Sequence, residues 1–239
     1  IILEKAGVPS SVNGLHATGL YIGILIASPF MEKMMQRLGF KPIILIGGML
    51  VVVSLAFFPV WEALTFWFFL RVLIGIGDQM VHFGTQTWVT TSVPAAKRGR
   101  SIALYGLSFA LGFTLGPLMT RLLEINESLP FILSSFTSLL VLSLMLFVKN
   151  SFPEQDMISA HSSSSLNRFV QTAKIAWVAL LPGFGYGFLE ATLNGIFPIY
   201  GIRIGHEVDI IAIIIPCFAL GSIILQFPLG MLSDRFGRR

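Results

Sequence analysis

The sequence contains few charged residues and a single cysteine. Only 12% of its 239 residues are charged, whereas 54% are hydrophobic, and the mean hydropathy is +0.81. A water-soluble domain of this length could not bury so much apolar surface. The shortage of charge therefore excludes a soluble globular protein and predicts a place in the lipid bilayer. The lone Cys217 excludes a disulfide framework.

Motifs of the common enzyme classes are also missing. The sequence has no G-x-x-x-x-G-K-[ST] phosphate loop, no H-E-x-x-H zinc motif and no G-x-S-x-G nucleophile turn. Its four histidines are scattered, so only folding could assemble a metal site from them. We therefore expect no catalytic residue, no metal and no cofactor. The net charge of +4 does not indicate nucleic-acid binding, because the basic residues form short clusters without interleaved aromatic residues.

Seven apolar stretches are long enough to cross a bilayer. A helix needs about 20 residues to span a hydrocarbon core of roughly 30 Å. The stretches are too long and too continuously apolar for the strands of a membrane barrel. The sequence therefore predicts an all-α integral membrane protein, a polytopic bundle whose seven transmembrane helices cover residues 13–35, 42–60, 63–89, 101–123, 129–148, 175–201 and 210–232.

The basic residues between the spans predict the orientation. Lysine and arginine resist translocation and gather on the cytoplasmic side. One set of connections holds twelve of them, the opposite set holds only Lys5, Arg121 and Arg203, and Arg71 lies inside a span. We therefore expect residue 1 outside the cell and residue 239 in the cytoplasm, with the protein in the plasma membrane, the inner membrane of the cell.

A hydrophilic stretch at residues 149–174 divides the chain. It lies between the fifth and sixth spans and contains a run of four serines, a composition typical of a flexible linker. The sequence therefore predicts a first helical unit over residues 1–148, a cytoplasmic linker over 149–174 and the start of a second unit over 175–239.

The two ends of the chain resemble each other. A shift of 198 residues aligns glycines with glycines and basic residues with basic residues: Gly7 with Gly205, Gly23 with Gly221, Gly39 with Gly237, Arg37 with Arg235 and Lys41 with Arg239. Many transporters are built from such repeats, as two similar bundles around a central path. Because Ile1 aligns with Ile199, near the end of the sixth span, we expect a helix to precede residue 1.

Four short motifs carry a more specific resemblance. They are EKMMQRLGFK at residues 32–41, RVLIGIG at 71–77, GFTLGP at 112–117 and GMLSDRFGRR at 230–239. The last is similar to the cytoplasmic-turn motif of the major facilitator superfamily, and the first is a degenerate copy in which Glu32 replaces a glycine and Gln36 an aspartate. The two middle motifs resemble the family's fourth-helix and fifth-helix motifs. The resemblance covers the whole chain.

The resemblance implies a carrier of twelve helices, of which the seven spans are helices two to eight. The partners that it implies are the lipid bilayer, a small-molecule solute, protons and the missing helices of the same carrier. It also implies a gating role for residues of the two cytoplasmic turns, namely Asp234, Arg235, Gly237, Arg238, Arg37 and Gly39. The alternative for the arginines is simple anchoring on the cytoplasmic side.

Three ionisable residues fall on one stripe of the third span. Arg71, Asp78 and His82 share this stripe with Gly75 and Thr85 at 100° per residue. An ionisable side chain in a membrane costs about 2.5 to 3.5 kcal/mol on insertion scales, so such residues are functional candidates. With Gly75 clearing space between them, the charges could bind a polar substrate or relay a proton. The alternative is an internal contact between Arg71 and Asp78. By resemblance, Arg71 is the arginine that proton-coupled members keep here.

The sixth span contains one acidic residue, Glu190. It shares a helix face with Tyr186 and Asn194, and with Gly183 and Phe197, which predicts the wall of a cavity. The alternative is a protonated glutamic acid that is hydrogen-bonded within the bundle. We expect Glu190 or Asp78 to gain and lose a proton during transport.

Small residues recur every four positions in the fourth span, at Ser108, Gly112, Gly116 and Thr120. This pattern favours close packing of two helices, and we expect a packing role for Gly75 of the third span as well. Pro117 predicts a bend, because it removes a backbone donor and clashes with the preceding turn. By resemblance, this motif is commonest among antiporters.

Together these features favour secondary active transport of a small solute by alternating access. Proton coupling is the favoured energy source, and efflux by antiport is slightly favoured over uptake. The alternative is a membrane scaffold or half-carrier that acts with another chain and transports nothing itself. We expect these 239 residues alone not to catalyse uptake, because half of the second bundle is missing.

Overall fold

The computed structural model describes residues 2–153, 165–218, 220–221 and 224. All regular secondary structure in these ranges is helical, as predicted. The candidate gating residues of the last motif lie outside the described residues: Asp234, Arg235, Gly237 and Arg238.

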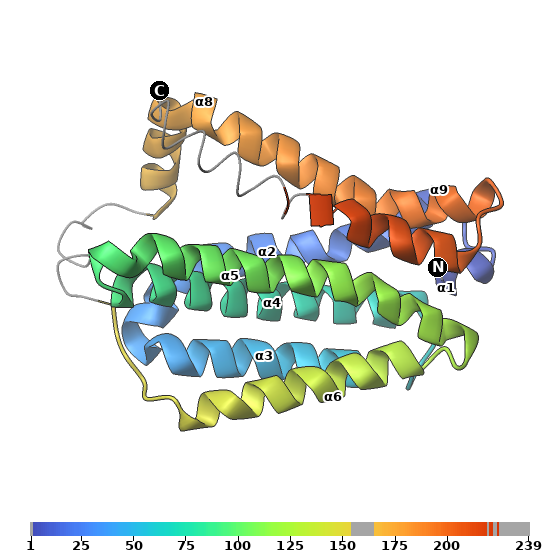
Figure 1. Ribbon diagram of the computed structural model, residues 1–239, viewed down its shortest axis with the longest axis horizontal. Coiled ribbons are helices and arrows are strands. Elements are labelled where there is room, and N and C mark those ends of the chain that lie inside the picture. The colour runs from blue at the N-terminus through green and yellow to red at the C-terminus, as the bar shows by residue number, and fades with distance from the viewer. Residues whose placement is uncertain (1, 154–164, 219, 222–223, 225–239) are drawn as a thin grey trace.

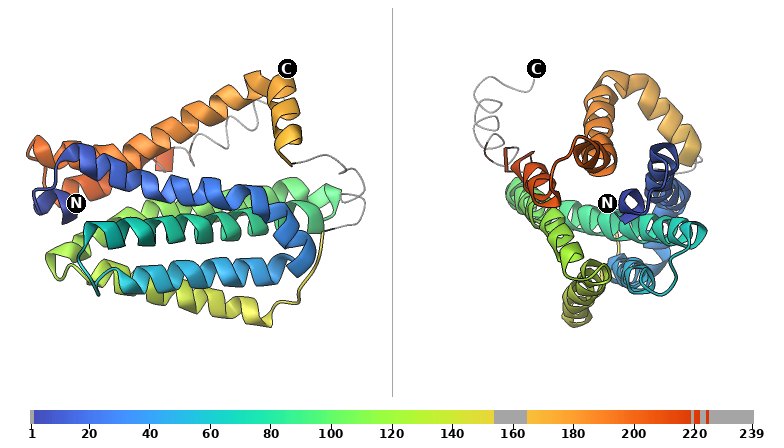
Figure 2. Two further views of the ribbon diagram at one scale, coloured as in Figure 1. Left: turned by 180° about the vertical axis from the view of Figure 1, so that it is seen from behind. Right: turned by 90° about the vertical axis from the view of Figure 1, so that its right-hand side faces the viewer.

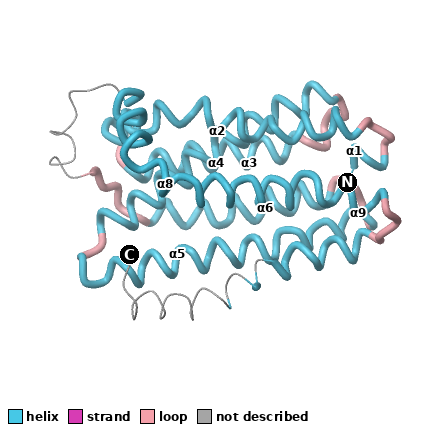
Figure 3. The backbone as a smooth tube through the Cα atoms, turned by 90° about the horizontal axis from the view of Figure 1, so that it is seen from above, coloured by secondary structure: helices cyan, strands magenta, loops and turns pink. Residues whose placement is uncertain are grey.

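The first unit is a bundle of long helices that run back and forth (Figure 1). Among the described residues, five helices are long and apolar enough to cross a membrane, which confirms the first five predicted spans as membrane-length helices. Loops lie mainly at the two ends of the bundle (Figure 3). A short helix, α1 (Ile2–Lys5), precedes them, and the bundle consists of α2 (Ser10–Leu38), α3 (Phe40–Phe57), α4 (Leu64–Ser92), α5 (Ala95–Leu115) with the 3-10 helix η1 (Gly116–Glu124), and α6 (Leu129–Leu144) with the 3-10 helix η2 (Met145–Phe147).

The second unit begins with α8 (Ser165–Ala191), the π-helix η3 (Thr192–Ile196) and α9 (Phe197–Arg203). The sixth predicted span is therefore helical from end to end. Only the beginning of the seventh is described, as the apolar helix Val208–Phe218. Helix α8 starts within the stretch predicted as a linker, because apolar residues already recur there at helical spacing, at Leu166, Phe169, Val170 and Ala173.

Helix α4 lies between α2 and α3, and glycines allow a close approach on both sides (Figure 2). A Cβ atom added to Gly75 would meet the carbonyl oxygen of Leu20 and lie 3.1 Å from the Cα of Gly23, in α2. A Cβ atom on Gly77 would lie 2.5 Å from the carbonyl oxygen of Gly47, in α3. Two residues turn an α-helix by about 200°, so the glycines of the RVLIGIG motif point to opposite sides. Backbone contact therefore fixes α4 to both neighbours.

Gly75 thus has a packing role that the sequence assigned to it only in part. We expected it to clear space between Arg71 and Asp78, but it is buried against α2. Helix α6 packs on the far side of α3, where the buried Ser135 hydroxyl donates a hydrogen bond of 2.9 Å to the carbonyl oxygen of Val52. At Gly116, before Pro117, the helix changes from α to 3-10 geometry, since proline cannot donate the next backbone hydrogen bond.

Two turns of the predicted internal repeat have the same hydrogen bonds, while its positions Arg235, Gly237 and Arg239 lie outside the described residues. Gly7 and Gly205 both adopt left-handed conformations, with φ of 73° and 87°. In the first turn the Gly7 amide donates to the carbonyl of Glu4, and the next amide donates to that of Leu3. The second turn repeats both bonds 198 residues later, from Gly205 to Ile202 and from His206 to Gly201. In each turn a left-handed glycine terminates the preceding helix, as in many helices.

We predict that Gly23→Ala destabilises the protein, because a Cβ atom there would lie 2.9 Å from the amide nitrogen of Ile76 and would force α2 away from α4. Overpacking of this kind typically costs about 1–3 kcal/mol. The measurement is thermal unfolding of the full-length protein in detergent. Gly14→Ala is the matched control in the same helix, since a Cβ at Gly14 meets nothing within 4 Å. Equal melting temperatures for the two variants would contradict the prediction.

Candidate functional site

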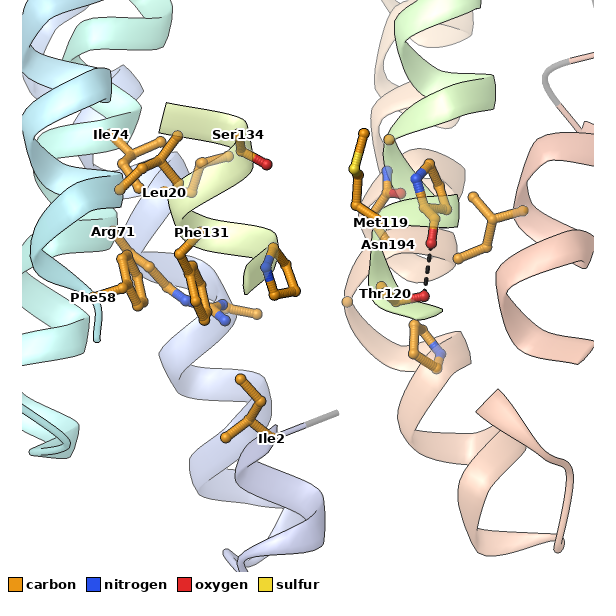
Figure 4. Close-up of a pocket in the computed structure, with 18 of the residues that line it drawn as sticks. Ile2, Leu20, Phe58, Arg71, Ile74, Met119, Thr120, Phe131, Ser134 and Asn194 are labelled. Atoms are coloured by element: carbon orange, nitrogen blue, oxygen red, sulfur yellow. Dashed lines mark hydrogen bonds between the residues drawn. The ribbon is translucent and has the colours of Figure 1, made fainter. Parts of the chain in front are cut away.

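A cavity of about 860 Å³ lies between the helices of the first unit and the η3–α9 region of the second (Figure 4). Its lining is mostly apolar and includes five aromatic side chains: Phe58, Trp67, Phe109, Phe113 and Phe131. The lining residues with polar side chains, Trp67 aside, are Asn13, Arg71, Ser108, Thr120, Ser134 and Asn194. Pockets with apolar walls and a few polar groups are the usual form of small-molecule sites.

Arg71 projects into this cavity from α4 (Figure 4). It is the only ionisable residue in the described lining. Its guanidinium forms no hydrogen bond or ion pair in the described part of the chain. The contact with Asp78 that we considered as an alternative is therefore not formed. The two residues are seven positions apart on α4, or about 10 Å along the helix axis.

Asn13 and His16 are buried polar residues of α2 that the sequence analysis did not select. The Nε2 atom of His16 lies 3.0 Å from the carbonyl oxygen of Leu64, so this nitrogen carries the proton and donates. Its Nδ1 atom is buried without a hydrogen bond, and its ring meets Phe68 edge-on. His16 also lies within electrostatic reach of Arg71. A lone histidine in an apolar span gives no sequence signal of such a contact.

A second polar group forms where α8 faces α4. Glu190 lies within electrostatic reach of both Asp78 and His82, and no hydrogen bond or ion pair joins it to either in the described chain. Asp78 is exposed, and His82 and Glu190 are half-buried. The Tyr105 hydroxyl of α5 lies 2.9 Å from the Nδ1 atom of His82. Tyr105 was missed because its neighbours from Ile102 to Leu107 are apolar residues and a glycine, so no pattern marks it.

The predicted face of the sixth span is divided. Asn194 lines the cavity, whereas Glu190 and Tyr186 are not in its lining. Asn194 belongs to η3, which lies close to α2, whereas Glu190 and Tyr186 belong to α8, which diverges from the first unit (Figure 1). The shared helix face is therefore not a single cavity wall.

The row of small residues in α5 and η1 also faces the cavity. Ser108, Gly112, Gly116 and Thr120 all line it, together with Pro117. A Cβ atom at Gly112 or Gly116 would meet nothing within 4 Å among the described residues. In this structure the small side chains thus enlarge the cavity, and close helix packing at Gly112 and Gly116 remains a prediction.

Two ion pairs connect the units at one end of the bundle, which we call the α9 end. The Arg203 Nε atom lies 2.7 Å from a carboxylate oxygen of Glu4, and Asn13 donates a hydrogen bond of 3.2 Å to the other oxygen. The Arg121 Nε atom lies 2.8 Å from Asp209. The hydrogen bond from Arg203, assisted by that from Asn13, lowers the pKa of the Glu4 carboxyl against the opposing effect of its desolvation.

The opposite end carries the turn between α2 and α3, which we call the Gly39 turn. Gly39 has a positive φ of 83°. The Asn150 side chain accepts a hydrogen bond of 3.1 Å from the Lys41 amide and donates one of 3.0 Å to the carbonyl of Leu38. The start of the predicted linker is therefore bound to this turn. Arg37 is exposed there and makes no ion pair with the described residues.

The units are close at the α9 end and apart at the other. Near the α9 end, a Cβ atom on Gly195 would lie 3.8 Å from the Cβ of Ala17, in α2. Figures 1 and 2 show α8 diverging from α2 towards the Gly39 turn. The cavity is therefore bounded by both units, and the ion pairs between the units in the described part of the chain lie at the α9 end.

These features define a polytopic helical membrane protein with a ligand-sized cavity between two units. The model of the Major Facilitator Superfamily matches residues 1–239. The chain therefore belongs to the major facilitator superfamily, as the motifs indicated.

Known relatives agree with this assignment. The chain is 53% identical over 239 residues to YfkF of Bacillus subtilis (strain 168), described as an uncharacterized MFS-type transporter. It is 22% identical over 237 residues to the uncharacterized MFS-type transporter YcaD of Salmonella enteritidis PT4. The matches cover 100% and 99% of this chain, and the chain spans 61% of each relative.

A solved structure supports the fold. The crystal structure of a D-xylose-proton symporter matches 96% of this chain and 60% of its own, with a TM-score of 0.69. Its sequence identity of 17% limits the comparison to the arrangement of helices.

We predict that Glu4→Gln and Arg203→Gln each loosen the α9 end, because each removes one partner of the ion pair. The measurement is the distance between spin labels at positions 6 and 206 of the full-length protein, by pulsed electron paramagnetic resonance. Longer distances should appear in each variant. Since the folded-state pKa of Glu4 is lowered, the ion pair is present at neutral pH and is lost as the pH falls through that pKa.

The exchange of both charges, Glu4→Arg with Arg203→Glu, is the control and should restore the short distance. If neither single substitution nor acidification changes the distance distribution, the ion pair does not hold this end closed.

Proposed function

We propose that the full-length protein is a secondary active transporter that moves a small solute by alternating access. The observation that carries this proposal is the cavity to which both units contribute, Arg71 from α4 and Asn194 from η3. Carriers of this type bind the solute between two bundles and open the site to one side at a time. The closed α9 end and the diverging opposite end support such a cycle.

The orientation belongs to the same proposal. The excess of basic residues on one side supports a cytoplasmic location of the Gly39 turn and an external location of the α9 end, in the plasma membrane. The structure then corresponds to a carrier that is open to the cytoplasm. Arg37 and Gly39, with Asp234, Arg235, Gly237 and Arg238, act on the cytoplasmic gate in this scheme.

Proton coupling rests on the acidic residues. Asp78 and Glu190 come from different units and lie within electrostatic reach of each other. Protonation of either one removes a repulsion between α4 and α8, so the proton can bias the two units towards approach. Proton exchange for an outgoing solute follows from the resemblance of the GFTLGP motif to antiporters. In this scheme, Gly112, Gly116 and Pro117 allow another helix to pack closely against α5 and η1 when the cavity is closed.

We predict that Asp78→Asn and Glu190→Gln each reduce solute-driven proton movement by about a hundredfold, the lower end of the rate effect of about 10² to 10⁴ of a positioned proton carrier. The measurement uses full-length protein in liposomes filled with a pH-sensitive dye, with a panel of solutes added outside. Glu62→Gln, in the loop between α3 and α4, is the matched control and should keep the proton signal.

Unchanged proton movement and unchanged pH dependence in both variants would remove these residues from the mechanism. If no solute in a broad panel moves in the unsubstituted protein, the transport proposal itself fails, and the scaffold alternative is favoured.

A further inference from the structure

We infer that the cavity binds an organic anion with a hydrophobic, aromatic-sized body, and that Arg71 holds the anionic group. This inference rests on the proposed function in taking the cavity as the solute site. It names the class of solute, which the family does not specify.

The charge of the lining favours an anion. Arg71 carries a permanent positive charge with five donors, and none of these is engaged by the described residues. The nearest acidic residue on its own helix, Asp78, is two turns away and outside the cavity lining. A guanidinium left unpaired among apolar walls is unfavourable, and a carboxylate, phosphonate or sulfonate supplies the missing acceptors in bidentate geometry.

The groups around Arg71 do not offset its charge. His16 already donates Nε2 to the Leu64 carbonyl and has no negative form to offer. Asn13 donates its amide to Glu4, whose carboxylate is paired with Arg203. The described surroundings of the cavity are thus cationic, so a cationic solute is disfavoured there.

The rest of the lining favours a hydrophobic body. The rings of Phe58 and Phe131 stack with centroids 4.8 Å apart and form one apolar wall with Trp67. Of the other polar lining residues, Thr120 donates its hydroxyl to the carbonyl of Pro117. Ser134 and Asn194 form no hydrogen bond within the described chain. Two free polar groups are too few for a sugar, whose hydroxyls all require partners, whereas they suffice to orient an aryl acid.

The test compares three ligands of nearly equal shape and different charge: 2-naphthoate, 2-naphthamide and 2-naphthylmethylammonium. Binding to the full-length protein in nanodiscs is measured by isothermal titration calorimetry and by quenching of Trp67 fluorescence, with Trp67→Phe as the reference. We expect 2-naphthoate to bind about tenfold or more tightly than the amide, as a charge-assisted hydrogen bond allows. The cation should bind most weakly.

Variants locate the effect. Arg71→Gln should remove the preference for the anion while leaving the affinity for the amide within about twofold. Arg71→Lys should retain part of the preference for the anion, because the lysine ammonium keeps the positive charge but cannot bind a carboxylate in bidentate geometry. Lys33→Gln is the control, since Lys33 is exposed and outside the cavity lining. If Arg71→Gln does not fold, the inference is tested by the affinities of the three ligands for the unsubstituted protein and for Arg71→Lys.

Equal affinities for the three ligands, or a preference for the anion that survives Arg71→Gln, would overturn the inference. Failure of transport is distinguishable from this outcome. Arg71-dependent binding of naphthoate, with no movement of naphthoate or of any solute of the panel across liposomes, would leave the anion site intact and remove the transport proposal. Conversely, movement of uncharged solutes that is unchanged in the Arg71 variants would support the transport proposal and overturn the anion site.

Discussion

The arrangement of the first unit depends on the backbone contact of α4 with its two neighbours. Gly75 against Gly23 and Gly77 against Gly47 bring three helices closer than any larger side chain would permit. In a bilayer, where apolar side chains gain nothing from leaving lipid, such contact is a main source of helix association. It also fixes the rotation of α4 about its axis. With that rotation set, Arg71 must face the cavity and Asp78 must lie on the side of α8.

The polar residues of α4 consequently fall into two zones. Arg71 lies near the α9 end with Asn13 and His16, where the walls are aromatic. Asp78 and His82 lie further along, where Tyr105 and Glu190 approach from other helices. A charge of one sign is thus separated from charges of the other sign by about two turns of one rigid helix. In the transport cycle proposed above, this separation would let solute and proton bind at different depths, to different side chains.

The sequence predicted the lengths and the helical nature of the spans, because insertion in lipid demands both. The glycine motif of α4, the 198-residue repeat and the charged residues within the spans could also be recognised, because each leaves a local pattern in the sequence. It could not predict the ion pair of Glu4 with Arg203, whose partners are 199 residues apart. Nor could it predict that Asn194 lines the cavity while Glu190 does not, since the divergence of α8 from the first unit is set by tertiary packing. Tyr105 meets His82 only through tertiary packing, for which no spacing rule exists.

The paired turns at Gly7 and Gly205 have a mechanical consequence. Each one ends its helix with the same two hydrogen bonds, and a left-handed glycine prevents the helix from growing past it. Neither unit can therefore lengthen or shorten at this corner when the protein changes shape. In the proposed alternating-access cycle, the units would then swing as bodies of constant length, and their ends far from these corners would travel the greatest distance.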